Sequence, residues 1–506
     1  MRYRSLWALI LILTLIQVLV LPLLTIDAPW YDEVITYQRI GGPPFELSRN
    51  IVDVVARTAQ FWSPLYFILL SIWGNLVGNS LFALRYWSLL VGLLAAVWVY
   101  RVAADLISRR TGLITVFLLS TSSFFLHYNH DMRAYTLYIL LGMIAVWTYW
   151  QVMYKGRKQF IWWLHLSLVV LFYTHFVAMV MVASVFIYHG FQYWRHPTGR
   201  GRQLIRHWRR LFILFVPELV LAAKASAAEG ANPRGLDFFE IWPTLFHDFG
   251  NGMGWLLLGL VIYGIYIGRK QPAVQYLVIL SGIYLVLAVG VNFVVDYLFH
   301  MRHILLLLPV FLLLVSLAIN DLWQRAKPLA AIVVLLWAGV GVGATTGWVT
   351  WGTEDIRLYL PVQPFDEAQA FIRACVQDGD TVIFHMTNEH SEADVYPTLV
   401  YYVAQNPVRF EQIRTFTSAE ASRLPTKHVE SEIPYRQLAQ EFVDGSPRVW
   451  LLMPSERAND PIVAEFGQAL AEINYSAPQQ DNRSSSDLVV LVYTQPTATG
   501  CTESQQ

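Results

Sequence analysis

The sequence predicts a polytopic α-helical membrane protein that carries a small C-terminal α/β domain. Hydrophobic residues make up 55% of the 506 residues and charged residues only 14%, whereas soluble proteins have about 25% charged residues. Mean hydropathy is +0.42. Long apolar stretches recur through residues 1–350, and short basic connectors separate several of them. These observations together indicate repeated membrane crossings.

The first apolar stretch covers residues 5–25, which carry no charge. It is long enough to cross a bilayer, which needs about 20 apolar residues. Arg2 and Arg4 precede it, and positive charges beside a span favour the cytoplasm. Because no small-residue cleavage site follows, we expect a retained helix rather than a signal peptide.

Later apolar stretches and basic connectors set the expected topology. The apolar stretches lie at 64–78, 82–104, 112–127, 134–153, 160–173, 176–193, 209–223, 252–268, 273–293, 302–320 and 328–349. The connectors are Arg109-Arg110, 155–158, 195–210 with six arginines, Arg269-Lys270, and Arg325 with Lys327. If every stretch spanned the membrane, all these connectors would lie outside, against the positive-inside rule.

Removing one span, 64–78, returns every basic connector to the cytoplasm. This stretch is short, begins at Pro64 and contains Gly74, Asn75 and Gly78. A stretch of this length is more often interfacial than spanning. The sequence therefore predicts eleven spans, with residues 42–80 forming an external loop whose helices lie at the membrane surface.

The same topology places the C-terminal part of the chain outside the cytoplasm. The composition becomes polar near residue 350, which divides a membrane domain at 1–350 from an α/β domain at 351–495 and a disordered tail at 496–506. Strand-like runs occur at 381–386, 448–453 and 487–494, and helical patterns at 366–376 and 462–473. Cys375 and Cys501 share the oxidising side, and the sequence leaves their pairing open.

Polar residues gather at the external ends of the expected spans. They are Asp32 and Glu33 after the first span, Asp131, Arg133 and Tyr135 at the fourth, His175 between the fifth and sixth, and Arg302 and His303 entering the tenth. Charged residues at membrane depth are expensive and usually functional. Each also has a structural explanation: the arginines as snorkelling residues, His175 as a packed helix-end residue, and Glu218 as the buried partner of a cation.

A shared site accounts for these residues together. One carboxylate is suited to act as a general base on an acceptor hydroxyl. Arginines match a lipid-linked phosphate because the guanidinium fork fits phosphate oxygens. The apolar walls between spans suit a polyprenyl tail, and the aromatic residues Trp30, Tyr31, Trp62 and Tyr66 suit sugar faces and the membrane interface.

Four segments, taken in order, resemble the GT-C fold membrane glycosyltransferases. They are YDE at 31–33, FWSPLYFILLSIWGNLVGNSLFALRYWSLLVGLL at 61–94, DMRAYTLY at 131–138 and MRHILLLLP at 301–309. The nearest branch contains the protein O-mannosyltransferases and the lipid A aminoarabinose transferase. The resemblance covers roughly residues 1–320. The chain departs from the family at Trp62-Ser63-Pro64, where the family has His-Pro-Pro, and at Asp131, where it has Glu.

The resemblance implies transfer of a sugar, hexosyl or pentosyl, from a polyprenyl-phosphate donor to an acceptor hydroxyl on the extracytoplasmic face. It makes Asp32 the base of an inverting displacement, with Glu33 in support. It assigns donor-phosphate or substrate binding to six residues: Asp131, Arg133, Tyr135, His175, Arg302 and His303. Some GT-C enzymes use a divalent metal beside such carboxylates, and the sequence leaves a metal open.

The expected partners are membrane lipid, the lipid-linked donor, and a lipid, glycan or protein acceptor. Zero net charge gives no bulk electrostatic reason to expect nucleic acid. A lipid-linked sugar transporter or flippase without catalysis is the alternative. Polar residues near the midplane and related repeats would favour it, whereas the charged residues here lie at external span ends. A membrane-anchored binding protein would not explain charges at four span ends.

The topology is open to a direct test. We expect single cysteines introduced at Asn79 or Ser80 to react with a membrane-impermeant reagent added outside the cell, because residues 64–78 do not span. The parent chain serves as the control for labelling of Cys375 and Cys501. Labelling of position 79 or 80 only from the cytoplasmic side would overturn the topology.

Overall fold

The computed structural model describes most of the membrane part of the chain and the core of its C-terminal part. The described residues are 2–25, 31–42, 46–58, 63–175, 177–220, 238–295, 300–349, 375–377, 379–386, 409–414, 443, 445–454, 458–459, 461–476, 479–480, 488–496 and 498. Two compact units are present. The first contains Met1–Ile26 and Leu47–Pro361, and the second contains Asp27–Glu46 and Val362–Gln506.

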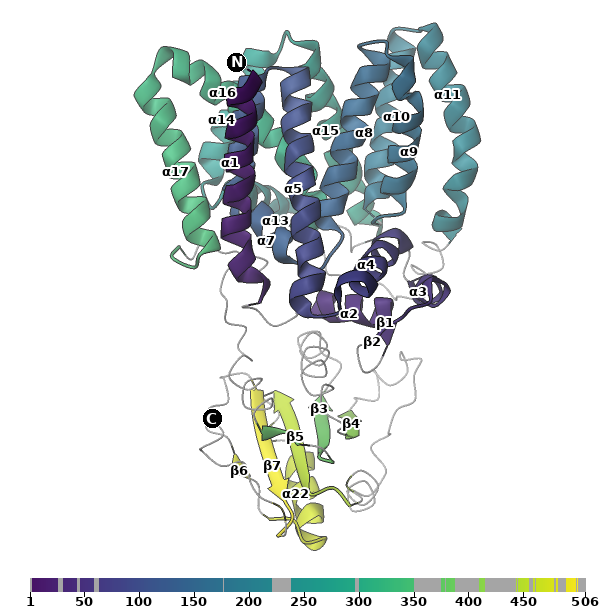
Figure 1. The fold of residues 1–506 in the computed structure, drawn as a ribbon, viewed down its shortest axis with the longest axis vertical. Coiled ribbons are helices and arrows are strands. Elements are labelled where there is room, and N and C mark those ends of the chain that lie inside the picture. Colours follow the sequence, from purple (N-terminus) through teal and green to yellow (C-terminus); the bar gives the residue numbers. More distant parts are fainter. Residues whose placement is uncertain are drawn as a thin grey trace. The chain divides into compact units, whose positions relative to one another are not determined.

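Helices make up the first unit (Figure 1). Their bounds are α1 Arg2–Val20, η1 Leu21–Leu24, α3 Ile51–Thr58, α4 Pro64–Val77, α5 Leu81–Leu106, α6 Arg109–Ser120, α7 Ser123–His130, α8 Tyr135–Met153, η2 Lys158–Phe160, α9 Ile161–Phe172, α10 Ala178–Arg195, α11 Gly199–Leu211, η3 Phe212–Leu214, α13 Phe238–Phe249, α14 Gly254–Gly268, α15 Pro272–Val295, η4 Met301–Ile304, α16 Leu307–Arg325 and α17 Lys327–Thr345. Helix α5 packs against α6 and α8, and α14 packs against α16.

Small residues allow these helices to approach closely. A Cβ added at Gly264 would lie 2.0 Å from the carbonyl oxygen of Leu314, so only glycine lets α14 approach the backbone of α16 there. Gly92 does the same beside α7, since a Cβ at that position would lie 1.6 Å from Oδ1 of Asn129. Helices in lipid gain association energy from such close packing rather than from a hydrophobic drive.

Six described helices are long and apolar enough to cross a membrane, and eight if each of two bent pairs is one span. The bends are 65° between α6 and α7 and 86° between α13 and α14. This is fewer than the eleven expected spans for identifiable reasons. Helix α9 has only 12 residues, and α10 ends in the polar run Gln-Tyr-Trp-Arg. The chain is nevertheless a multi-pass membrane protein, with its apolar helices bundled side by side.

The structure changes the detail of three expected segments of the membrane part. The stretch at 112–127 lies in the bent pair of α6 and α7. The stretch at 209–223 is not one continuous helix over its described residues: it contains the end of α11, then η3, and then a further helical segment at 216–220. Helix α11 begins near the start of the arginine-rich connector because Thr198 caps its first turn, accepting a hydrogen bond from Gly201 N at 3.0 Å, and because Leu204 and Trp208 form a buried stripe. Part of the expected external loop 224–251 is helix α13.

The expected interfacial segment contains two short helices. Helix α3 is amphipathic, with Val54 and Thr58 buried and most of its other residues exposed. Helix α4 has 14 residues, a length of about 21 Å, and does not reach the length of a span. Gly78 ends α4 at a φ of 110°, and Ser80 begins α5 by accepting a hydrogen bond from Ala83 N at 3.2 Å.

The second unit contains helix α2, Tyr31–Ile40, and a five-stranded sheet of order β4-β3-β5-β7-β6. The strands are β3 Thr381–Met386, β4 Arg409–Arg414, β5 Arg448–Pro454, β6 Gln479–Gln480 and β7 Leu488–Thr494, and helix α22 is Pro461–Glu472; a short pair, β1 Gly41–Gly42 and β2 Glu46–Leu47, follows α2. Strand β3 runs parallel to β4 and β5, and β5 runs antiparallel to β7. These strands and α22 confirm the expected α/β domain.

Other expectations for the C-terminal part fall on residues that are not described. The helix at 366–376 and the tail at 496–506 lie almost wholly outside the described residues. Cys375 is disulfide-bonded, whereas Cys501, the second cysteine of the sequence, is outside them. The domain boundary near residue 350 stays a prediction.

A buried ion pair holds the start of β3 against β5. The side chain of Arg448 donates from Nε to Asp380 Oδ1 at 3.0 Å and from a terminal nitrogen to Oδ2 at 2.7 Å. Trp450 Nε1 and the Gln377 backbone nitrogen also donate to Oδ2, each at 2.9 Å. Asp380 is 0% exposed and Arg448 is 1% exposed, so each charge depends on its partner for compensation.

This pair predicts a strong stability effect. Asp380→Ala leaves the Arg448 guanidinium buried without its carboxylate, and breaking a buried pair from one side costs about 3–5 kcal/mol. We expect amides of β3 and β5 to lose hydrogen-exchange protection in the full-length protein. Glu465, on the exposed side of α22, supplies the control, because Glu465→Ala removes a carboxylate from the same unit without opening its core. Equal protection in the Asp380 variant and the control would contradict the role of the pair.

Candidate functional site

The bend between α6 and α7 is fixed by a single asparagine. Asn251, at a φ of 52°, accepts hydrogen bonds from both the backbone nitrogen and the hydroxyl of Ser123 at 3.0 Å. Its amide nitrogen donates to the carbonyl oxygens of Thr121 at 3.2 Å and Trp337 at 3.3 Å. The backbone groups freed by the bend therefore find partners inside the protein, as a low-dielectric environment requires.

Helix α7 carries polar side chains into the interior of the first unit. All eight of its residues are buried, including His127, Asn129 and His130. The turn that follows holds Asp131, which is 2% exposed, and the half-buried Arg133. The Arg133 backbone nitrogen donates to the Asp131 carbonyl oxygen at 2.8 Å, which holds the two residues in one tight turn before α8 begins.

A continuous series of rings connects this turn to distant parts of the chain. Neighbouring ring centroids lie 4.8 Å apart for His130–His127, 4.8 Å for His127–Tyr128, 4.7 Å for Tyr128–Tyr135, 5.6 Å for Tyr135–His175, 5.7 Å for His175–His303 and 5.3 Å for His303–His300. We call these residues the ring series. Aromatic pairs at such distances each contribute about 0.5–1.5 kcal/mol beyond burial, so the series ties α7, α8, the turn after α9 and η4 together.

Two tyrosines orient the far end of the ring series. Tyr138 and Tyr284 share a hydrogen bond between their hydroxyls at 2.8 Å, and the Tyr284 hydroxyl donates to the carbonyl oxygen of His303 at 2.9 Å. The Tyr138 ring also stacks on His175, with centroids 6.1 Å apart. The turn that carries Arg302 and His303 is therefore connected to α8 and α15 by hydrogen bonds.

Three arginines contribute positive charge to this region. Arg85 is 2% exposed and donates to the carbonyl oxygen of Leu24 at 3.3 Å. Arg85 and Arg302 both lie within electrostatic range of His127, and Arg133 lies in the turn that follows α7. Because a guanidinium stays charged in a protein, these arginines add fixed positive charge near the buried end of α7, where the carboxylate of Asp131 also lies.

The structure thus brings together six of the residues expected from the sequence: Asp131, Arg133, Tyr135, His175, Arg302 and His303 all lie in or beside the turn and the ring series. Sequence reasoning missed Arg85, His127 and His300. Arg85 was detectable as one of only two charges, with Arg101, in the otherwise apolar stretch 82–104. The histidines gave no signal, because only the ring contacts show what they do.

Asp32 and Glu33 belong to the second unit. They lie in the first turn of α2 rather than in a loop, where carboxylates interact favourably with the helix dipole. The two are not equivalent: Glu33 is 0% exposed, whereas Asp32 is half-buried. Their place beside the arginines of the first unit stays a prediction.

The structure describes only some of the aromatic residues expected at the site, and it gives Glu218 a different partner from the expected one. Trp30 and Trp62 are outside the described residues, whereas Tyr66 is buried in α4. Glu218 is buried, as expected, but its partner is not a cation: the backbone nitrogen and the hydroxyl of Ser63 both donate to it, the hydroxyl at 3.2 Å. This bond holds the first residue before α4, in the segment where the chain departs from the family pattern.

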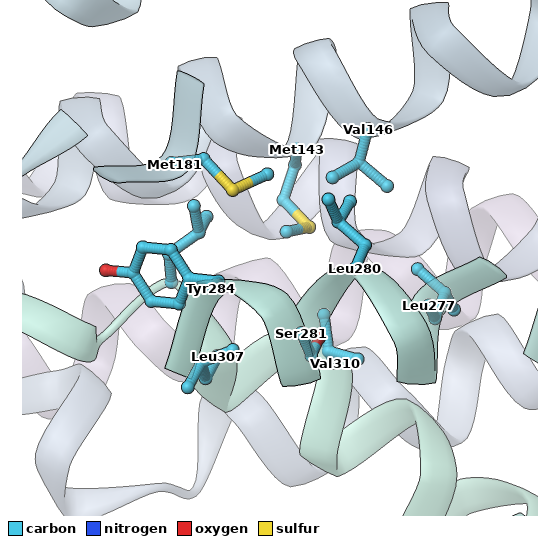
Figure 2. Close-up of a pocket in the computed structure, with 10 residues that line it drawn as sticks. Met143, Val146, Met181, Leu277, Leu280, Ser281, Tyr284, Leu307 and Val310 are labelled. Carbon is cyan, nitrogen blue, oxygen red and sulfur yellow. The ribbon is translucent and has the colours of Figure 1, made fainter. Parts of the chain in front are cut away.

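An apolar hollow lies beside the ring series. Its cavity volume is about 10 Å³, which is about the room that one water molecule needs. Its walls come from α8, α10, α15 and α16, with the thioethers of Met143 and Met181 gathered near Leu280 and Tyr284 (Figure 2). Tyr284 therefore has its ring on the hollow and its hydroxyl in the hydrogen bonds that reach His303.

The described part of the chain contains no ready-made metal site. No group of three or more His, Cys, Asp or Glu side chains there has the geometry to hold a metal ion. In the ring series the five imidazoles contact one another and two tyrosine rings in edge-to-face or tilted pairs. Their nitrogens therefore do not converge on one point. The carboxylates of the two units leave a metal open, as the sequence did.

Comparison with known proteins identifies the fold. A family model described as dolichyl-phosphate-mannose-protein mannosyltransferase matches residues 62–219, and no curated protein matches the chain. ArnT from Cupriavidus metallidurans in the apo state has a TM-score of 0.57 and 13% identity, covering 96% of this chain and 97% of that chain. The same protein bound to undecaprenyl phosphate has a TM-score of 0.55 and 14% identity, over 97% and 99%.

This chain has the GT-C fold. An oligosaccharyltransferase from Archaeoglobus fulgidus, solved with Zn and sulfate, also matches, with a TM-score of 0.52 and 12% identity over 95% of this chain and 72% of that chain. The matches confirm the expected resemblance to GT-C glycosyltransferases in fold, from the membrane helices through to the C-terminal domain. The family match ends at residue 219, next to Glu218, and begins next to its partner Ser63.

Proposed function

We propose that this protein is a membrane glycosyltransferase that moves a sugar from a polyprenyl-phosphate donor to an acceptor hydroxyl on the extracytoplasmic face. The observation that carries the proposal is the positive charge of Arg85, Arg133 and Arg302 around the buried turn after α7. Such charge in an apolar setting is well suited to a phosphate, because guanidinium groups bind its oxygens with two parallel hydrogen bonds. The GT-C fold and the family match support the same chemistry.

The reaction follows from the chemistry of the groups. The acceptor oxygen forms a bond to the anomeric carbon of the sugar while the bond from that carbon to the phosphate oxygen breaks. The departing polyprenyl phosphate gains negative charge, which Arg133 and Arg302 neutralise. Asp32 takes the proton of the acceptor hydroxyl, with Glu33 in support. Attack opposite to the departing phosphate inverts the anomeric centre.

The apolar outer surface of the first unit supports a lipid-linked rather than a soluble donor. A polyprenyl chain is hydrocarbon, and many large apolar side chains of these helices are exposed, as in a protein surrounded by lipid. ArnT, whose fold this chain shares, was solved bound to undecaprenyl phosphate. The acceptor is a lipid, glycan or protein hydroxyl, and the sugar is a hexose or pentose.

The assignment of the base predicts a clear loss of activity. Asp32→Asn keeps the size of the side chain but removes its capacity to accept the proton, so transfer should fall by about 10²–10⁴-fold. The control is Asp53→Asn on the exposed face of α3, which should leave the rate unchanged. Product formation by each purified, membrane-reconstituted variant decides this, and near-normal turnover of the Asp32 variant would transfer the role to Glu33.

A second prediction concerns the donor. The protein should use a polyprenyl-phosphate sugar and not a nucleotide sugar, and Arg133→Ala or Arg302→Ala should weaken use of the donor more than use of the acceptor. Lysine at either position should restore activity only in part, because it lacks the planar fork. Arg57→Ala, on the exposed side of α3, is the matched control.

Mass spectrometry of products formed with each donor, at varied donor and acceptor concentrations, measures both effects. Efficient transfer from a nucleotide sugar would contradict the proposed donor. Movement of the lipid-linked sugar across a reconstituted bilayer, with no glycosylated product, would instead favour the flippase.

A further inference from the structure

Two basic segments of the sequence lie at the end of the first unit where α1 begins: the connection from α8 to α9, and the start of α11, with α7 toward the other end (Figure 1). They contain Lys155, Arg157 and Lys158 between α8 and α9, and six arginines within residues 195–210. We call them together the basic face. The segment 132–217, which contains all of it, has no aspartate or glutamate, so the sequence supplies no neighbouring acid to neutralise it.

Tertiary packing brings the two basic segments together. Gly156 has a φ of 71°, and a Cβ placed there would lie 2.4 Å from a guanidinium nitrogen of Arg200. The guanidinium of Arg200, in the first turn of α11, therefore lies against Gly156, between Lys155 and Arg157 in the sequence. Gathering like charges on one surface is unfavourable in the isolated protein, so an anion bound there would offset their repulsion.

Helix α11 is held so that its arginines face outward. Gly201, Leu204 and Trp208 are buried on one side, and the Gly201 carbonyl oxygen pairs with Nε2 of His189 at 3.1 Å. Arg202, Arg206 and Arg209 follow at helical spacing on another side and are exposed. The basic face is thus built on the connection from α8 to α9, the end of α10 and the exposed side of α11.

Acidic partners at the same end of the unit are already engaged elsewhere. Asp105 pairs with Arg101 at 2.9 Å, and Asp321 pairs with Arg325 at 2.8 Å. The positive-inside rule explains why cations lie at this end. With these two carboxylates engaged elsewhere, a bound anion is a suitable partner for the basic face.

Exposed side chains around the basic face point to the bilayer as the source of the anion. Trp162, Trp163 and Trp194 are 73%, 59% and 78% exposed, and exposed tryptophans are typical of the membrane–water interface. Past its arginines, the helical chain continues through Phe212 and Ile213, which are 54% and 72% exposed. The order of these side chains matches the layers of a bilayer: the basic ones suit the headgroups, the tryptophans the interface, and the apolar ones the hydrocarbon.

We propose that the basic face binds anionic phospholipid headgroups of the leaflet on the α1 N-terminal side, and so anchors α8 to α11 in that leaflet. Clusters of four to eight basic residues beside a span bind anionic lipid, and the fork of an arginine fits a phosphodiester. A neutral zwitterionic lipid offers the same phosphate but also a cation that this surface repels. The proposal is independent of the sugar-transfer chemistry.

Native mass spectrometry of the full-length protein in detergent tests it. Phosphatidylglycerol and phosphatidylcholine with identical acyl chains are titrated separately, and the wild type should bind phosphatidylglycerol more tightly. Arg206→Gln combined with Arg209→Gln should weaken phosphatidylglycerol binding by about tenfold, because each basic residue near an anionic lipid surface contributes to the free energy of binding. Raising the salt concentration should weaken it as well.

The matched control removes two cations from the same end of the unit but outside the basic face: Arg269→Gln with Lys270→Gln. It should retain wild-type binding. Should the α11 variant not fold, Arg157→Gln with Lys158→Gln tests the loop instead. Equal binding of the two lipids by the wild type, or equal loss in variant and control, would overturn the proposal. Competition by free glycerol phosphate as effective as the lipid itself would show a site for soluble anions and would also overturn it.

Discussion

The geometry of the first unit depends on how the backbone is satisfied where α6 bends into α7. In an apolar environment an unpaired amide is costly, and Asn251 supplies both an acceptor for Ser123 and donors for two carbonyl oxygens. The bend also needs a glycine at position 341, because a Cβ there would lie 1.9 Å from the Thr121 carbonyl oxygen. With the bend fixed, α7 directs its histidines and the following arginine turn inward.

The two ends of the first unit handle charge in opposite ways. At the end with the ring series, a small number of arginines lie buried or half-buried among imidazole and phenol rings. A ligand phosphate would interact strongly with their charges there, because the local dielectric constant is low. At the other end, many cations stand exposed on α11 and its neighbouring loop, where each is weakened by water and salt. The first arrangement suits a reacting phosphate, and the second suits a surface held by many weak contacts.

Sequence reasoning predicted the fold class well because the apolar stretches and the basic connectors are long-range patterns. It predicted β3, β5, β7 and α22 because the periodicities of strands and helices are clear in those segments. It failed at α11, where five arginines in thirteen residues hid a buried stripe of Gly201, Leu204 and Trp208. The site was predicted where charges interrupt apolar sequence. His127 and His300 escaped because their contacts come from tertiary packing, which no spacing in the sequence encodes.

The Asn251 contacts also affect when this protein can complete its fold during synthesis. Asn251 follows Ser123 by 128 residues, and Trp337, which donates to the carbonyl oxygen of Leu118 at 2.9 Å, follows that residue by 219. At about 5–20 residues per second, the bent segment leaves the ribosome on the order of ten seconds before Asn251 is made. During that interval the freed backbone groups of the bend must be hydrated, or must find partners in the insertion machinery. A residue that is synthesised late therefore completes a bend that forms early.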